Sequence, residues 1–328
     1  MKIGVIGGGS WGTALGVHLA RSGASVTLWA REAEVVEGIT TGRRNPWYLP
    51  DVELPSGLGA SRDPAEAVHA AGVVIVVVPS EFFAATVKPL PALGADVAIV
   101  SATKGFDPER HLRMTQVLEE RFPAARIAAL SGPTFAKEVA SALPTAAVIA
   151  TTDDGLGVEL QRTLGSRELR LYTNRDVVGV ETGGALKNVI AVATGLADGL
   201  GLGENARAAL ITRGLAEITR LAVALGGLRA TLAGLAGLGD LVLTCTGTLS
   251  RNHALGVALA RGATLAEVER GTRMIAEGVR TVRSALVLAR RHDVTLPIAG
   301  EVAAVLFDGK RARAALDALL DRPWARED

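Results

Sequence analysis

The chain has 328 residues, 48% of them hydrophobic, which is long for a single core and predicts two domains. Its formal net charge of +1 argues against a nucleic-acid partner, although a local phosphate site remains compatible with it. No apolar run reaches the roughly 18–20 residues that a membrane span requires. One cysteine, Cys245, excludes an intrachain disulfide, fits a reducing cytoplasm and is expected to be a small buried thiol.

The first half of the chain alternates short apolar runs with helical patterns. The uninterrupted Val/Ile run at 73–78, closed by Pro79, is typical of a central parallel strand that is buried on both faces. The other predicted strands are Lys2–Ile6, Ser25–Trp29, 97–100, 126–130 and Thr145–Ala150. Strands that alternate with helices in this way predict a doubly wound parallel sheet.

A glycine-rich loop joins the first strand to a helix predicted at Ser10–Arg21. Gly7, Gly9 and Gly12 follow the GxGxxG spacing at the start of a βαβ pattern. Gly7 would make the tight turn, Gly9 would let a pyrophosphate approach the backbone, and Gly12 would let the helix pack on the strand. The free N–H groups at the start of that helix favour an anion, so the loop predicts a dinucleotide site.

The residues about 20 positions beyond the loop distinguish NAD from NADP. An arginine there accommodates a 2′-phosphate, and a carboxylate binds the ribose 2′-hydroxyl. The sequence has Arg31 followed by Glu32, so Arg31 favours NADPH while Glu32 keeps NADH open. Two solvated charges that begin the next helix are the alternative interpretation.

The second half is rich in helical patterns from about residue 186 onward. Helices are predicted at 211–225, where two glycines follow, at 280–291 and at 301–320. The predicted fold is therefore an N-terminal α/β domain with a Rossmann-type doubly wound sheet, residues 1–183, and an all-α C-terminal domain, residues 184–328.

Loops after strands form the ligand-binding edge of such a sheet. Lys104 directly follows one strand and either reaches a ligand or lies on the surface. Thr134 is expected to cap a helix that begins at Phe135, with Gly132 exposing its N–H in front of it. The segment at 79–81 is interpreted as structural.

Lysine is rare in this chain, with six residues against 29 arginines, and Lys187 lies in an otherwise apolar helix. Partial burial lowers the pKa of an ammonium group toward the range of proton transfer, which arginine cannot perform. A snorkelling lysine is the alternative. Asp240, in a glycine-rich apolar stretch, needs a partner such as this lysine unless it caps a helix or turn.

Ser250, Arg251 and Asn252 begin a further helix. A guanidinium, an amide and free helix N–H groups at one point suit a phosphate, although a capped surface helix explains the same residues.

Eight segments together resemble bacterial-type NAD(P)-dependent glycerol-3-phosphate dehydrogenase over nearly the whole chain. They are GGGSWGTAL at 7–15, NPWYLP at 45–50, SATKG at 101–105, SGPTFAKE at 131–138, GGALKNVIA at 183–191, GLAGLGDLVLTCTG at 234–247, SRN at 250–252 and AEGVRT at 276–281.

The resemblance implies a reversible reduction of dihydroxyacetone phosphate to sn-glycerol 3-phosphate with NADPH or NADH, feeding glycerophospholipid synthesis. It makes Lys187 the proton donor and acceptor, with Lys104 and Asp240 as the other catalytic residues. The substrate-binding residues that it implies are Lys104, Gly132, Thr134, Lys187, Asp240, Ser250, Arg251 and Asn252. The implied cofactor-binding residues are Gly7, Gly9, Ser10, Trp11, Gly12, Arg31, Tyr48, Lys104, Ala136, Arg251, Ile275 and Glu277. No metal is expected, and a homodimer is left open.

Three positions depart from the family pattern: Thr134 stands where serine is more common, Glu32 where a basic residue is common, and His253 where arginine is common. Two alternatives remain at this point. A β-hydroxyacid dehydrogenase would have asparagine four residues after its lysine, where this chain has Ala191. A non-catalytic NAD(P) sensor would not need Lys187, Asp240 and Arg251 together.

Overall fold

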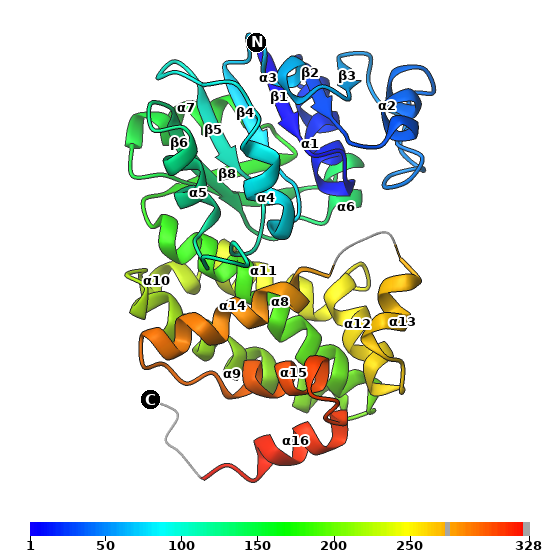
Figure 1. Cartoon of the computed structure of the whole chain (residues 1–328), viewed down its shortest axis with the longest axis vertical. Coiled ribbons are helices and arrows are strands. Elements are labelled where there is room, and N and C mark those ends of the chain that lie inside the picture. The colour runs from blue at the N-terminus through cyan, green and yellow to red at the C-terminus, as the bar shows by residue number, and fades with distance from the viewer. Residues whose placement is uncertain (273–275, 324–328) are drawn as a thin grey trace.

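The computed structural model describes residues 1–272 and 276–323, which form an α/β lobe and a helical lobe (Figure 1). In the described residues, the N-terminal lobe contains one eight-stranded sheet with the order β3-β2-β1-β4-β5-β6-β7-β8. The strands are β1 Lys2–Ile6, β2 Ser25–Trp29, β3 Leu58–Ser61, β4 Val73–Val76, β5 Ala98–Ser101, β6 Arg126–Ser131, β7 Thr145–Ala150 and β8 Leu169–Asn174.

The order of the strands reverses direction between β1 and β4, and this point places the ligand cleft. From β1 the chain builds outward through β2 to β3, then returns to β4 and continues through β5 to β6. Ligands bind at such a reversal, beyond the carboxyl ends of the strands. β4 is buried along its whole length because β1 and β5 flank it and helices cover both faces.

Helices of the N-terminal lobe connect the strands and cover the sheet. They are α1 Ser10–Arg21, α2 Ala33–Thr40, α3 Pro64–Val68, α4 Ser80–Val87, α5 Met114–Arg121, α6 Ala136–Ala140 and α7 Asp154–Leu164. α1 presents an apolar face from Ala14 to Leu19 to the sheet core and ends before Gly23, whose positive φ of 90° ends the helix.

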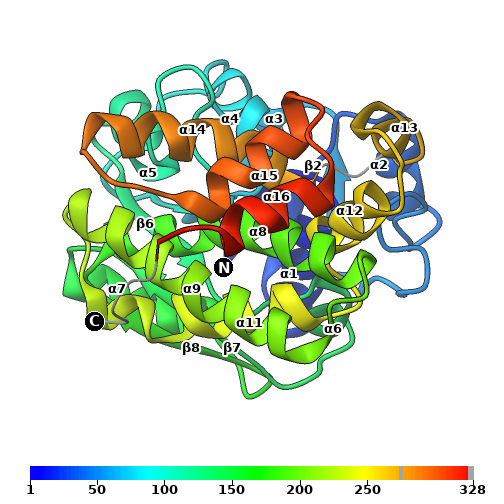
Figure 2. The same cartoon turned by 90° about the horizontal axis from the view of Figure 1, so that it is seen from below.

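The helical lobe is built around α8, Val177–Gly199, which is buried from Gly179 to Ala197. Figure 2 shows α8 among the other helices, and α9, α11, α12, α14 and α15 all contact it. The other elements of this lobe are α9 Gly203–Ala224, α10 Arg229–Leu232, the π-helix η1 Leu235–Gly239, α11 Asp240–Thr246, α12 Arg251–Ala260, α13 Leu265–Arg270, α14 Glu277–Arg291, α15 Pro297–Phe307 and α16 Ala312–Leu320.

The main chains of α8 and α12 approach each other closely where they cross. A Cβ added to Gly195 would lie 2.1 Å from the carbonyl oxygen of His253, and one added to Gly256 would lie 2.2 Å from that of Val192. Because no side chain fits at either position, this crossing requires glycine.

The structure confirms the predicted fold and corrects three details. β6 and β7 pair antiparallel, so the sheet is mixed where an all-parallel sheet is predicted. β3 and β8 are strands that the sequence pattern does not reveal, since each lies at an edge and carries no continuous apolar run. The helix predicted at 301–320 is two helices, α15 and α16, separated by Gly309 with its positive φ of 69°. A domain division between 183 and 184 falls inside α8 and stays a prediction.

Within the described ranges, no single helix has the length and apolar character needed to cross a membrane. One bent pair, Arg229–Thr246 with Arg251–Ala260, is long and apolar enough when its two parts are taken together, and the parts meet at an angle of 46°.

Candidate functional site

The glycine loop lies at the carboxyl end of β1 and begins α1. Gly7 has a φ of +134°, and a Cβ there would lie 2.6 Å from the carbonyl oxygen of Val77. A Cβ at Gly12 would lie 1.9 Å from the carbonyl oxygen of Gly7, so only glycine lets α1 pack this closely. At Gly9, the N-cap of α1, no atom lies within 4 Å of an added Cβ. The open space lies at the helix N-terminus, where a pyrophosphate binds most favourably.

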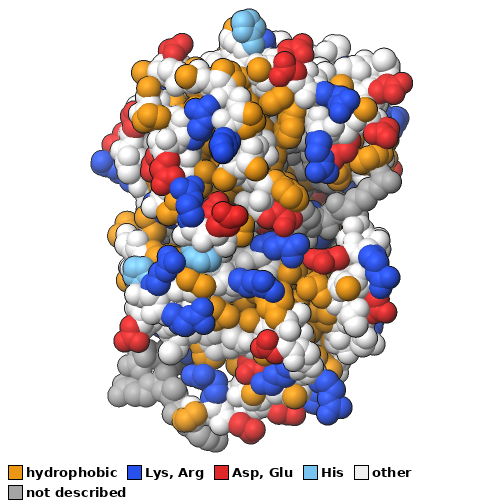
Figure 3. Space-filling view, in the orientation of Figure 1, with side chains coloured by type: hydrophobic (Ala, Val, Ile, Leu, Met, Phe, Trp, Pro, Cys, Tyr) orange, Lys and Arg blue, Asp and Glu red, His pale blue; other side chains and the backbone are white. Residues whose placement is uncertain are grey.

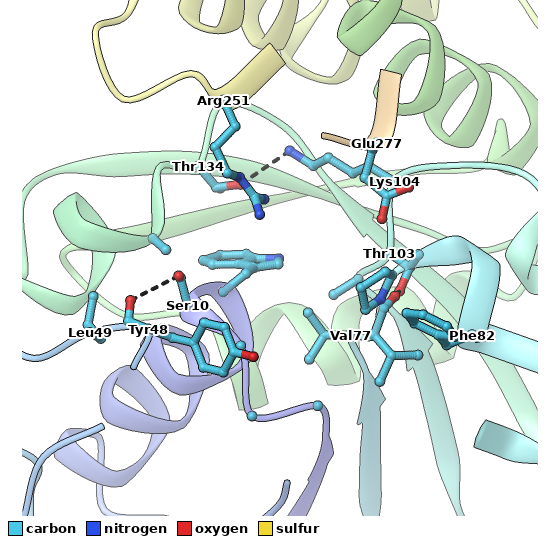
Figure 4. A pocket seen from close by; sticks show the side chains of 18 of the residues that line it. Ser10, Tyr48, Leu49, Val77, Phe82, Thr103, Lys104, Thr134, Arg251 and Glu277 are labelled. Atoms are coloured by element: carbon cyan, nitrogen blue, oxygen red, sulfur yellow. Dashed lines mark hydrogen bonds between the residues drawn. The ribbon is translucent and has the colours of Figure 1, made fainter. Parts of the chain in front are cut away.

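Asn45 joins a second loop to the glycine loop through hydrogen bonds. This residue was not predicted from the sequence as part of the site. Its fully buried amide donates to the carbonyl oxygen of Gly8 at 2.9 Å and to Thr13 Oγ1 at 2.8 Å. Its carbonyl oxygen accepts from the backbone N–H of Tyr48 at 3.1 Å. Ser10 closes the contact by donating to the carbonyl oxygen of Tyr48 at 2.9 Å (Figure 4). Its only mark in the sequence is an asparagine before proline in the 45–50 segment, a pattern that has many ordinary explanations.

A cavity of about 760 Å³ extends from the glycine loop to the helical lobe. Figure 4 shows Tyr48 and Ser10 on one side of it, Val77 and Phe82 on another, and Arg251 entering from the helical lobe. The predicted site residues that line it are Gly7, Gly9, Ser10, Trp11, Arg31, Tyr48, Lys104, Thr134, Ala136, Lys187, Ser250, Arg251, Asn252 and Glu277. The cavity therefore contacts both lobes.

Three predicted residues in the described part of the chain do not line the cavity. Gly12 lies beneath the glycine loop, and the carbonyl oxygen of Gly132 faces Lys104. Asp240 is fully buried behind the cavity wall. Ile275 lies outside the described residues.

Behind the cavity wall, one buried carboxylate lies between two ammonium groups of residues that line the cavity. Lys187, from α8, donates to Asp240 Oδ1 at 2.5 Å, and Lys104, from the loop after β5, donates to Asp240 Oδ2 at 2.6 Å. Lys187 also donates to Thr244 Oγ1 at 2.7 Å. Thr244 lies one turn after Asp240 on α11, and sequence reasoning assigned it no role. The predicted pairing of Lys187 with Asp240 is present.

The environment of Lys187 adjusts its proton affinity. The pKa of Lys187 is lowered to about 8, chiefly by burial; the nearby charge of Lys104 acts in the same direction, while the carboxylate of Asp240 opposes both. Partial burial is predicted from the sequence, and the observed burial is nearly complete. A group with this pKa exchanges a proton readily near neutral pH.

Lys104 also forms hydrogen bonds with the loop that follows β6 of the sheet. It donates to the carbonyl oxygen of Gly132 at 2.8 Å, and its Nζ lies 3.4 Å from Thr134 Oγ1, the contact drawn in Figure 4. Gly132 has a φ of +131°, which a residue with a side chain rarely adopts. Thr134 does not cap α6 as predicted, because α6 begins one residue later and Phe135 is its N-cap. Its hydroxyl instead donates to the carbonyl oxygen of Gly132 at 3.1 Å, beside Lys104.

The start of α12 forms the far end of the cavity. Ser250 is the N-cap, as predicted, and its hydroxyl accepts from the N–H of His253 at 3.3 Å. Arg251 extends into the cavity (Figure 4). The buried amide of Asn252 donates to Asn188 Oδ1 at 2.9 Å and accepts from the N–H of Gly278 at 2.9 Å. Asn252 therefore connects α12 to α8 and α14.

The segment at 79–81, interpreted from the sequence as structural, contacts a predicted cofactor residue. Glu277 accepts from the hydroxyl of Ser80 at 2.7 Å and from its N–H at 3.2 Å. Burial raises the pKa of the Glu277 carboxyl, and the bonds from Ser80 and the charge of Arg251 oppose that shift. Arg280 adds an ion pair with Glu81 at 3.0 Å. These contacts join α14 to the start of α4, across the line between the lobes that Figure 3 shows bordered by charged side chains.

Arg31, His253 and Cys245, which the sequence analysis singled out, lie in three different environments. Arg31 pairs with Glu32 at 2.9 Å, and the arginine side chain is 74% exposed while that of the glutamate is 16% exposed. His253 contacts Asp198 at 2.6 Å and is not part of the cavity lining. Cys245 is a buried thiol, as expected, and burial raises its pKa to about 12. Among the described residues, no group of three or more His, Cys, Asp or Glu side chains could hold a metal ion.

Comparisons with known proteins agree along the chain. Residues 2–156 match the family model for the N-terminus of NAD-dependent glycerol-3-phosphate dehydrogenase, and residues 176–317 match the model for its C-terminus. The glycerol-3-phosphate dehydrogenase [NAD(P)+] of Koribacter versatilis is 50% identical, over 99% of this chain and 98% of the relative. That of Streptomyces avermitilis is 47% identical, over 98% and 97%.

Solved structures give the same result. The crystal structure of glycerol-3-phosphate dehydrogenase from Coxiella burnetii has a TM-score of 0.94 and 38% identity, over 98% of this chain and 99% of that one. A ketopantoate reductase from Ralstonia eutropha shares the fold at a TM-score of 0.61 and 18% identity, over 98% of this chain and 100% of that one.

Proposed function

The chain belongs to the NAD-dependent glycerol-3-phosphate dehydrogenase family and is an oxidoreductase that uses NADH or NADPH, and we propose that Lys187 is the acid and base of its reaction. That reaction is the reversible reduction of dihydroxyacetone phosphate to sn-glycerol 3-phosphate, a role consistent with the supply of glycerophospholipid synthesis. The single observation that supports the proposal is the buried ammonium of Lys187 on the cavity wall, hydrogen-bonded to Asp240.

Reduction of a ketone places negative charge on its oxygen in the transition state. The ammonium of Lys187 would stabilise this oxygen and then protonate it, and the neutral amine would take the proton back from the alcohol in the reverse direction. Lys104 would add a second positive charge beside the same oxygen or the phosphate. Asp240 would act as a positioning residue, because its carboxylate lies behind both lysines and keeps both Nζ atoms in place.

The phosphate would bind at the start of α12. Arg251 supplies a guanidinium that faces the cavity, and α12 is long enough, at 10 residues, to present an N-terminal partial positive charge. Anchoring the phosphate there would hold the carbonyl carbon near Lys187 and so reduce the entropic cost of the reaction.

The residues of the N-terminal lobe, together with Glu277 of the helical lobe, fit a dinucleotide. The open space at Gly9 and the N-terminus of α1 suit the pyrophosphate, Arg31 and Glu32 would face the adenosine ribose, and Ser10, Trp11, Tyr48, Ala136 and Glu277 would contact the remainder. When bound, the nicotinamide supplies or accepts the hydride. The cleft walls contributed by Val77 and Phe82 are apolar and would exclude water from the reacting atoms.

The test is an absorbance assay at 340 nm with dihydroxyacetone phosphate or unphosphorylated dihydroxyacetone, each with NADH and NADPH. We expect oxidation of the cofactor with the phosphorylated ketone and little with dihydroxyacetone. Equal rates with both ketones would contradict the phosphate anchor, and no oxidation with either would contradict the proposed reaction.

Cellular location and assembly are further proposals. The single cysteine supports the reducing cytoplasm as the place of action. A homodimer and a domain division at 183/184 stay predictions, which light scattering of the purified chain and limited proteolysis would check.

A further inference from the structure

Phe106 belongs by sequence to the α/β lobe, but its ring belongs to the core of the helical lobe. It lies two residues after Lys104, in the loop between β5 and α5, and is 2% exposed. It forms one buried apolar cluster with residues of α8 and α14, among them Leu186 and Val279. By contrast, Phe122 at the end of α5 is equally buried but belongs to a cluster of the sheet's own lobe. The loop after β5 therefore carries an apolar anchor into the other lobe.

Polar contacts farther along the same loop reach the same helices. His111 Nδ1 lies 3.1 Å from Ser284 Oγ on α14. Arg113 donates to Glu181 Oε2 on α8 at 2.7 Å. The other oxygen of that carboxylate accepts from the N–H of Thr115 at 2.9 Å, at the start of α5. The loop is thus attached to α8 and α14 at several points beyond Phe106, and Phe106 is the attachment nearest to Lys104.

The residues between the anchor and the ammonium leave little room for movement. Gly105 is buried, and a Cβ there would lie 2.7 Å from Ser80 Oγ and 3.3 Å from Glu277 Oε2. Lys104 and Phe106, on either side of this glycine, both direct their side chains to the helical lobe, one to Asp240 and one to the core. A shift of Phe106 would therefore move the Cα of Lys104 as well.

We propose that Phe106 is a positioning residue for Lys104: its ring, seated in the core of the helical lobe, fixes the 104–106 segment so that the ammonium of Lys104 meets Asp240 beside Lys187. The inference rests on the roles proposed above for Lys104 and Lys187. Four rotatable bonds set the position of the Lys104 ammonium relative to its Cα, so a displaced main chain would leave that ammonium with several alternative positions.

Two consequences follow for the reaction. Loss of the ring would reduce turnover, because the second positive charge would no longer be held beside the reacting oxygen. It would also release Lys187 from the charge of Lys104, which lowers the pKa of Lys187. The pH at which ketone reduction declines would therefore move upward, an effect that a loss of packing alone would not produce.

The experiment is a double-mutant cycle with a matched control. Phe106→Ala, Lys104→Ala and the double variant are assayed for ketone-phosphate reduction across pH, together with Phe106→Leu, Phe122→Ala and Phe122→Leu. We expect Phe106→Ala to lower kcat by about 10- to 100-fold and to raise the pH of the declining limb. Phe106→Leu should restore most of the activity, and the Phe122 variants should lose stability with kcat within about twofold of the parent.

In the Lys104→Ala background, Phe106→Ala should change kcat by less than about twofold, because the group that it positions is already absent. Additive losses in the cycle would overturn the proposal, as would an equal loss of kcat in Phe122→Ala. If Phe106→Ala does not fold, Phe106→Val, which also removes the ring, takes its place in the same cycle and is judged by the same criterion. Full activity of Lys104→Ala alone would instead contradict the role of Lys104, which separates that failure from this one.

Discussion

Lys104 and Lys187 come from different lobes and hold the two oxygens of one carboxylate. Lys104 Nζ lies 2.6 Å from Asp240 Oδ2, and Lys187 Nζ lies 2.5 Å from Asp240 Oδ1. Two ammonium groups this close would repel each other in the absence of the intervening negative charge. Asp240 therefore completes a centre to which each lobe contributes one cation.

Lys187→Ala should abolish turnover while leaving the cofactor site intact. Removal of a general acid typically costs 10²- to 10⁴-fold in rate, so we expect a loss of about 10³-fold or more in kcat. The glycine loop lies in the other lobe, so the affinity for NADPH, measured by fluorescence titration, should change by less than about threefold. A variant with near-normal turnover would show that another group transfers the proton.

The two directions of the reaction should depend on pH with opposite signs. Lys187 must carry its proton to reduce the ketone, so kcat/KM for reduction should fall as pH rises through about 8. It must be neutral to accept a proton from the alcohol, so kcat/KM for oxidation should rise through the same range. Profiles of both directions between pH 6 and about 10 check this, and parallel limbs in the two directions would contradict it.

Asp240→Asn should move the pH profile in the direction opposite to Phe106→Ala. The carboxylate raises the pKa of Lys187, so its replacement by an amide should lower that pKa and move the declining limb of reduction to lower pH. Two buried or half-buried cations would also lose their partner, at a cost of about 3–5 kcal/mol in the free energy of unfolding. Urea unfolding and pH–rate profiles measure the two effects, and an unmoved limb would exclude electrostatic coupling.

The choice of cofactor should depend on the pair Arg31 and Glu32. Arg31→Ala removes the guanidinium that would bind a 2′-phosphate and should lower kcat/KM with NADPH by about 10- to 100-fold, with NADH nearly unchanged. Glu32→Gln removes a negative charge and a competing partner of Arg31, so it should raise the ratio of NADPH to NADH efficiency. The values of kcat/KM with NADPH and with NADH for each variant check both statements. An unchanged ratio of the two values in both variants would show that other residues determine the choice of cofactor.

Glu217 should make the stability of the helical lobe depend on pH. It lies buried on α9 and accepts from the N–H groups of Ile298 and Ala299 at the start of α15. Burial raises its pKa to about 7 in the folded chain, above its ordinary value of 4.5, so the folded state favours the protonated form and loses stability as pH rises from 4.5 to 7. Glu217→Gln should therefore stabilise the chain at pH 8, by at most about 3 kcal/mol, and change little at pH 4.5. Urea midpoints at both pH values check this, with the exposed Glu34→Gln as the control.

The sequence reveals those helices, strands and turns whose pattern of apolar residues and glycines reflects their place in the folded structure. The Val/Ile run of β4 and the glycine spacing at 7–12 each appear as a pattern in a few consecutive residues, so they could be read directly. Strands β3 and β8 could not, because edge strands need no continuous apolar run. The antiparallel pairing of β6 with β7 is likewise invisible, since pairing direction depends on the path of the chain between them.

The residues of the site also fall into two groups, those that the sequence reveals and those that it does not. Lys187 and Asp240 were identifiable because charged groups in apolar stretches need partners. Thr244 and Asn45 were not, because a threonine or an asparagine in such segments has many ordinary explanations. The bond of Ser80 to Glu277 joins positions 197 residues apart in the sequence, and no local pattern indicates such a contact.

The crossing of α8 and α12 sets a minimum length for the substrate. Lys187 lies on one of these helices and Arg251 begins the other, and the bond from Asn252 to Asn188 ties them beside the cavity. Because the main chains touch at Gly195 and Gly256, no change of side-chain rotamer can bring the two helices closer. The span from proton donor to phosphate anchor is therefore set by the backbone. Because the helices cannot move closer, a phosphorylated carbonyl compound one carbon shorter would lose either the contact of its carbonyl with Lys187 or that of its phosphate with Arg251.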